Sequence, residues 1–130
     1  MRAFALLLCL AIQPKPHRVV VGVTAPGMQV YQVVLGNVEN IRKDFAPEPV
    51  EVEIVCYASG IDMLLKNPRL AKRMEKLSKE GVTFAACANT VKARKIPASS
   101  MYKFVRIVPS GAAEVVRKQE AGWSYLKGGF

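Results

Sequence analysis

Runs of β-branched residues alternate with amphipathic helical stretches along this sequence, and this alternation constrains the fold more than any other feature. Residues 17–23 form a Val-rich run that ends at a Thr-Ala-Pro-Gly turn. Residues 28–45 carry apolar side chains at helical spacing, and residues 50–57 return to a strand pattern. Strands separated by helices predict parallel pairing with right-handed crossovers. We therefore expect an α/β fold, a three-layer α/β/α sandwich with a mainly parallel sheet.

The same alternation continues to the end of the chain. Gly81 is the expected C-terminal stop of a basic amphipathic helix. The predicted elements are a short helical piece at 61–65, a helix at 69–80, a strand at 82–86, a helical turn at 91–96, a strand at 105–109 and a last helix from Ser110 and Gly111 through Leu126. The sequence thus predicts four strands.

The carboxyl ends of these strands are the expected place for a functional crevice, as in other open parallel sheets. They fall at residues 24–27, 57–60, 87–90 and 109–111. Small, hydroxyl-bearing or glycine residues are predicted to line the crevice: Thr24, Gly27, Ser59, Gly60 and Ser110. Only Cys87 adds a strong nucleophile, so we expect the chemistry to centre on it.

Several groups near Cys87 in the sequence could stabilise a thiolate. Asn89 or Thr90 is the expected N-cap of the following helical turn, which would direct backbone N–H groups at the sulfur. Cations follow within two turns, at Lys92, Arg94 and Lys95. Helix N-termini and cations lower a thiol pKa from about 8.5 towards neutrality. The alternative is an inert, buried cysteine.

Cys56 lies inside the second strand, so we expect a core thiol. With the common strand order 2-1-3-4, the second and third strands are not neighbours. The thiols of Cys56 and Cys87 would then lie too far apart for a disulfide.

The remaining composition excludes several classes of function. The net charge is +9, which attracts anions in general, but zinc-finger spacing and RNA-recognition aromatics are absent, so nucleic acid is not the expected partner. One histidine cannot supply a metal triad or a Ser-His-Asp arrangement, and no phosphate-binding glycine motif occurs. We expect no metal and no cofactor.

Residues 1–16 have a basic residue, Arg2, directly after Met1 and continue with an apolar run, which is typical of a secretory leader. The run is shorter than the roughly 20 residues of a membrane-spanning helix, so no stable membrane anchor is expected. We predict a leader at 1–16, one domain at 17–130 and a periplasmic or exported protein. A short buried strand or a misplaced start codon, with a cytoplasmic protein, is the alternative.

Two stretches, residues 82–90 around Cys87 and residues 108–127 with the run Glu-Val-Val-Arg-Lys-Gln-Glu-Ala-Gly-Trp, resemble the DsrE/DsrF-like proteins of sulfur oxidation. The similarity is to their short, exported-looking members and extends over nearly everything after residue 17. It implies a flavodoxin-like sandwich of the YchN-like type that assembles into homotrimers or hexamers. In relatives that carry persulfide sulfur, the acceptor cysteine matches Cys87.

The residues and the resemblance together predict a sulfur-transfer protein, either a persulfide carrier or a sulfurtransferase, that uses one cysteine at a strand end. Its partners would be sulfur donor and acceptor proteins or small sulfane-sulfur compounds. The alternative is a non-catalytic oligomer that binds a small anion in the same crevice.

Overall fold

A computed structural model describes residues 13–130 of the chain. The leader predicted at 1–16 lies outside the described residues except for residues 13–16, which form neither helix nor strand. None of the helices in the described part is long and apolar enough to cross a membrane. The elements in chain order are β1 His17–Val23, α1 Met28–Phe45, β2 Val50–Cys56, the 3-10 helix η1 Ala58–Leu64, α2 Pro68–Lys79, β3 Thr83–Cys87, α3 Ala88–Ala93, the 3-10 helix η2 Ala98–Ser100, β4 Val105–Val108, α4 Gly111–Glu120 and β5 Ser124–Lys127.

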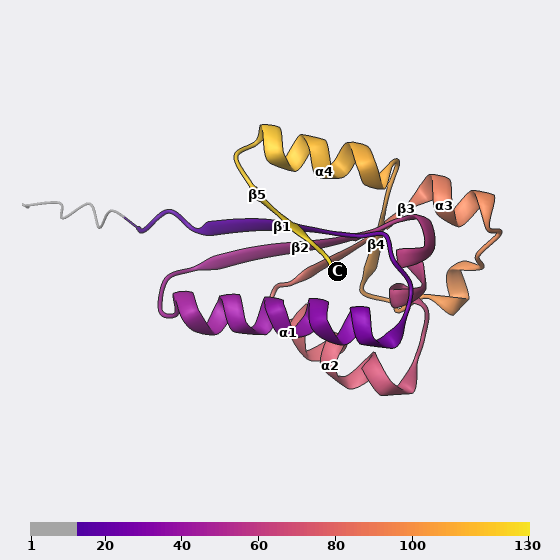
Figure 1. Cartoon of the computed structure of the whole chain (residues 1–130), viewed down its shortest axis with the longest axis horizontal. Coiled ribbons are helices and arrows are strands. Elements are labelled where there is room, and N and C mark those ends of the chain that lie inside the picture. The colour runs from indigo at the N-terminus through magenta and orange to yellow at the C-terminus, as the bar shows by residue number, and fades with distance from the viewer. Residues whose placement is uncertain (1–12) are drawn as a thin grey trace, which may run out of the picture.

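The five strands form one parallel sheet in the order β4-β3-β2-β1-β5. Helices α1 and α2 cover one face and α4 covers the other, which gives three layers (Figure 1). The predicted α/β/α sandwich with a parallel sheet is confirmed. The expected strand order 2-1-3-4 is wrong, because β2 pairs with β3.

The handedness of the crossovers explains this order. When successive right-handed connections lie on the same face of a parallel sheet, each new strand is added beside the previous one in the same direction. The sheet therefore grows from β1 to β4 in one direction, and α4 crosses the opposite face and returns the chain to the free side of β1 (Figure 1).

The C-terminal strand β5 is the element that the sequence pattern missed. The last helix ends at Glu120, and Gly122 follows with a φ of 90°. The N–H groups of Gly122 and Trp123 donate to the carbonyls of Gln119 and Lys118, at 2.9 and 3.0 Å, which closes the helix in a Schellman-type turn. Ser124 is then free to pair with Val19 of β1.

The apolar core is divided by the sheet. The larger cluster lies between the sheet and the helices α1 and α2, and includes Leu35, Ile54, Met74 and Phe84. The smaller cluster lies under α4 and includes Val115. Because side chains alternate along a strand, neighbouring residues of β2 and β3 contribute to opposite clusters.

A buried carboxylate fastens α4 to the sheet. Glu53 of β2 is 1% exposed, and its two oxygens lie 2.8 Å from Arg106 Nη2 and 2.9 Å from Lys118 Nζ. The Arg106 guanidinium also lies 3.0 Å from Glu114 on α4. Trp123 packs on Lys118, whose ammonium lies 4.2 Å from the ring centroid. These contacts fix the position of α4 above the strands.

Candidate functional site

Cys87 is the last residue of β3 and lies at the carboxyl edge of the sheet, where the sequence predicted it. The next helix, α3, begins at Ala88, so Cys87 itself occupies the N-cap position. The expectation that Asn89 or Thr90 would be the N-cap is wrong, because the strand passes into the helix without a loop. Cys87 is 5% exposed and thus buried at the end of the strand.

The start of α4 lies close to Cys87. Strand β4 pairs with β3, with Val108 opposite Cys87, and α4 follows directly after β4. Ser110 is the N-cap of α4, and its hydroxyl accepts a hydrogen bond from Ala113 N at 3.3 Å. Gly111 is the first helical residue. A Cβ atom on Gly111 would lie 2.8 Å from Tyr57 Cβ, so this close approach requires glycine.

The groups around the sulfur favour the thiolate of Cys87. Burial disfavours the charged form, but hydrogen bonds from the Gly111 backbone, the Thr90 side chain and the backbones of Thr90 and Asn89 together lower the pKa of Cys87 below its ordinary value. These donors come from the first residues of two helices, α3 and α4. The site can therefore hold a negative charge on sulfur.

Thr90 also joins α3 to the end of β2. Its Oγ1 accepts a hydrogen bond from the backbone N–H of Ala58 at 3.1 Å. Ala58 has a φ of 48°, in the left-handed region, where non-glycine residues are uncommon. A single side chain thus binds the exit of β2 and also favours the thiolate at the end of β3.

The cations that follow Cys87 have different surroundings. Arg94 lies 2.8 Å from Asp62 Oδ1 and forms an ion pair with it. Lys92 and Lys95 are exposed, and neither forms an ion pair within residues 13–130. Hydrogen-bond donors make the principal contributions that lower the pKa of Cys87. That these cations stabilise the thiolate stays a prediction.

Cys56 differs from Cys87 in its position and in the direction of its pKa shift. It is fully buried among the residues under α1 and α2, and burial strongly raises its pKa. It pairs in register with Ala86, so its side chain and that of Cys87 project from opposite faces of the sheet. Both thiols are free, as expected, but the reason is this opposite orientation and not the strand order.

The residues predicted to line the crevice all lie at the same carboxyl edge of the sheet, but they have different surroundings. Thr24, Gly27 and Ser59 are exposed. Gly60 is buried against β1, where an added Cβ would lie 2.1 Å from Val23 O. It holds the end of β2 close to the end of β1. Ser110 caps the first turn of α4.

Two residues beside the thiol were missing from the predicted set, Gly111 and Tyr57. Burial, and after it the neighbouring Tyr125 and Cys87, raise the pKa of Tyr57. The adjacency of β3 and β4 brings Gly111 to the thiol, and the dipeptide Ser110-Gly111 after the fourth strand was the available signal.

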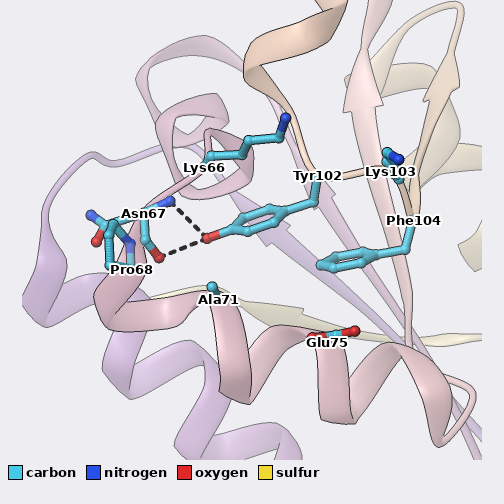
Figure 2. Close-up of a pocket in the computed structure, with 8 residues that line it drawn as sticks. All are labelled: Lys66, Asn67, Pro68, Ala71, Glu75, Tyr102, Lys103 and Phe104. Carbon is cyan, nitrogen blue, oxygen red and sulfur yellow. Dashed lines mark hydrogen bonds between the residues drawn. The ribbon is translucent and has the colours of Figure 1, made fainter.

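The described chain also has an apolar groove away from Cys87. Its volume is about 580 Å³, and its walls are the first turns of α2 and the segment before β4 (Figure 2). Tyr102 hydrogen bonds to the backbone of Asn67 in both directions, accepting at 2.9 Å and donating at 3.0 Å. Its lining residues are Lys66, Asn67, Pro68, Ala71, Glu75, Tyr102, Lys103 and Phe104, and none of them surrounds the thiol. Within residues 13–130, no group of three His, Cys, Asp or Glu side chains could hold a metal ion.

The family model for the DsrE/DsrF-like family matches residues 18–127, a span that begins in β1 and ends with β5. The chain belongs to the DsrE/DsrF-like family. This family is associated with sulfur relay. Among proteins with curated descriptions, no relative matches the chain.

Solved structures support the same fold. The protein of unknown function MTH1491 from Methanobacterium thermoautotrophicum is 29% identical with a TM-score of 0.80, and the match covers 85% of this chain and 98% of that one. The conserved protein of unknown function BT1422 from Bacteroides thetaiotaomicron is 12% identical with a TM-score of 0.56, over 85% of this chain and 93% of that one. The second likeness concerns the fold alone.

Proposed function

We propose that this DsrE/DsrF-like protein is a sulfur carrier, and that Cys87 holds the transferred sulfur as a persulfide. The observation that carries the proposal is the contrast between its two described thiols. Hydrogen-bond donors from two helices lower the pKa of Cys87 at the sheet edge, whereas burial raises that of Cys56 in the core. A thiolate is the nucleophilic form of cysteine, so Cys87 is the better suited of the two to attack a sulfur donor.

The chemistry needs no oxidant. The Cys87 thiolate attacks the outer sulfur of a sulfane donor such as thiosulfate. The new sulfur–sulfur bond forms as the old one breaks, and sulfite leaves with the bonding electron pair. In the second step an acceptor thiolate attacks the outer sulfur of the Cys87 persulfide, and the Cys87 thiolate leaves.

The donors around Cys87 would serve both steps. They stabilise negative charge on its sulfur, which the thiolate carries before the first step and regains in the second. A lower thiol pKa also makes Cys87 a better leaving group. The same hydrogen bonds therefore favour loading and release of sulfur.

Intact-mass measurement tests the proposal. The purified protein is incubated with thiosulfate or polysulfide and weighed before and after reduction. We expect a reducible gain of one sulfur atom in the wild type and in Cys56→Ser, and no gain in Cys87→Ser. A Cys87 that stays unmodified with every donor would contradict the proposal and favour a protein that binds small anions without covalent chemistry.

A further inference from the structure

Acidic side chains are absent from the stretch of sequence that contains Cys87. No Asp or Glu occurs between Glu80 and Glu114, whereas five residues of that stretch are Lys or Arg. The stretch comprises β3, α3, η2 and β4, and so includes Cys87 and everything that follows it up to α4. The segment that carries the thiol therefore contributes basic and no acidic side chains to its surroundings.

Ion pairs neutralise only part of this wall. Arg94 is paired with Asp62, and Arg106 is paired with Glu53 and Glu114. Lys92 and Lys95 are exposed and form no ion pair within the described chain. At a rise of about 1.5 Å per helical residue, Lys92 lies roughly 8 Å from Cys87 along α3, and Lys95 follows shortly after the end of that helix.

The basic surface extends from α3 to the start of α2. The Lys66 ammonium donates to Ser99 O of η2 at 2.8 Å, so Lys66 lies beside the segment that follows α3. Lys66 and its neighbour Arg69 are exposed and form no ion pair within residues 13–130. Figure 2 shows Lys66 above the ring of Tyr102, at the rim of the groove. We call the set Lys66, Arg69, Lys92 and Lys95 the basic edge.

The basic edge extends over α2, α3 and the segments next to them, so it matches an extended acidic surface better than a small anion. Residues 88–100 contain no Phe, Tyr or Trp on which a nucleic acid base could stack. The Tyr102 ring beside Lys66 is half-buried, and its hydroxyl is bound to the Asn67 backbone. A protein cysteine, in contrast, supplies the acceptor thiol that sulfur transfer requires.

We propose that the basic edge docks an acidic partner protein, which presents its acceptor cysteine to Cys87 from a surface rich in Asp and Glu. This inference rests on the proposed function for its chemistry. Attraction between opposite charges would raise the rate of encounter and orient the two thiols.

Peptides that differ only in charge test the inference. Three peptides carry one cysteine flanked by Glu, by Gln or by Lys, and each is offered to the protein after loading with polysulfide. We expect the Glu peptide to accept sulfur roughly tenfold faster than the Lys peptide at low salt, with the preference decreasing at 1 M salt. Equal rates for the three peptides would overturn the inference.

Charge reversal locates the surface. In the double variant Lys92→Glu with Lys95→Glu, the preference should shift towards the Lys peptide. The matched control, Lys43→Glu with Arg117→Glu, changes the net charge equally at exposed positions of α1 and α4 near the amino edge of the sheet and should keep the wild-type preference. For each protein, the transfer rates to the Glu and Lys peptides are divided by the rate to the Gln peptide. This ratio removes any effect of the substitutions on the reactivity of the Cys87 thiol itself. If the control variant loses the preference for the Glu peptide as strongly as the Lys92→Glu, Lys95→Glu variant does, the inference is overturned.

A parallel experiment separates this inference from the proposed function. The same peptides are supplied as disulfides, and thiol–disulfide exchange with Cys87 is followed without any persulfide. If no persulfide forms but exchange still prefers the Glu peptide, the sulfur-carrier proposal fails and the docking surface stands. If persulfide forms but neither assay depends on charge, only the docking surface fails. Tighter binding of single-stranded RNA than of polyglutamate to the basic edge would also contradict it.

Discussion

Thr90 Oγ1 lies 3.1 Å from the backbone nitrogen of Ala58 and accepts its hydrogen bond, although the two residues follow different strands. Burial raises the pKa of Cys87, but the same side chain is among the groups that lower this pKa overall. One hydroxyl thus connects the ends of β2 and β3 and stabilises the thiolate.

Thr90→Val should raise the pKa of Cys87, because valine keeps the shape of threonine and removes the hydroxyl. The free energy of unfolding should fall by about 1 kcal/mol, since Ala58 N–H loses its acceptor. The pH dependence of Cys87 alkylation measures the first effect and urea unfolding the second. Thr90→Ser, which retains the hydroxyl, is the matched control and should have a pKa near that of the wild type. A Thr90→Val protein with an unchanged pKa would show that the hydroxyl does not act on the sulfur.

The lowered pKa of Cys87 predicts how stability changes with pH. The folded state favours the Cys87 thiolate, so its contribution is present above the unfolded thiol pKa of about 8.5 and is lost as pH falls through the folded pKa. The wild type should therefore gain stability relative to Cys87→Ser between mildly acidic pH and pH 9. Urea midpoints of the two proteins measure this difference, and Cys56, present in both, cancels. If the difference in stability between the wild type and Cys87→Ser stays constant or shrinks with rising pH, the folded protein does not favour the Cys87 thiolate.

Gly111→Ala should disturb the site. The new Cβ would lie 2.8 and 2.9 Å from Tyr57 Cβ and Cδ1, so the start of α4 must shift and weaken the hydrogen bond to Cys87. We expect a higher pKa of Cys87 and a lower free energy of unfolding. Gly36→Ala is the control, because its Cβ would meet only Arg73 Nη2 at 3.6 Å within α1. That substitution should stabilise the protein by roughly 0.5–1 kcal/mol and leave the thiol unchanged.

Glu53→Gln should lower the free energy of unfolding by about 2 kcal/mol, because it removes the charge that pairs with Arg106 and Lys118. Burial disfavours the charged form of Glu53, but hydrogen bonds from Lys118 and Arg106 lower its pKa overall. Its contribution is therefore present above the unfolded pKa of about 4.3 and is lost as pH falls through the folded pKa. Urea unfolding of both proteins at pH 7 and at pH 3 should show a difference that shrinks at the lower pH.

The sequence predicted the layers of the fold because each strand and helix has a periodicity that its own residues determine. It also placed Cys87 correctly, since an apolar strand leads directly to it. Strand order could not be obtained this way, because it depends on which face each crossover helix covers. The sequence predicted that the helix after Gly111 continues through Leu126, whereas it ends at Glu120, before Gly122 with its positive φ.

The contacts of the site were less predictable than its position. Asn89 and Thr90 were expected near the sulfur because they follow it in the chain. Gly111 and Ala58 come from other parts of the sequence, and only the pairing of β3 with β4 and of β2 with β3 brings them close. The ion pair between Arg94 and Asp62 is likewise a product of the packing of η1 against α3.

The pKa of Cys87 is the quantity on which the proposed chemistry most directly depends. The rate of its alkylation by iodoacetamide between pH 5 and 10, followed by peptide mass mapping, measures this pKa in the folded protein. The account predicts a midpoint below the ordinary thiol value of about 8.5, with Cys56 unreactive until the protein unfolds. A midpoint at or above that value would contradict the assignment of Cys87 as the activated thiol.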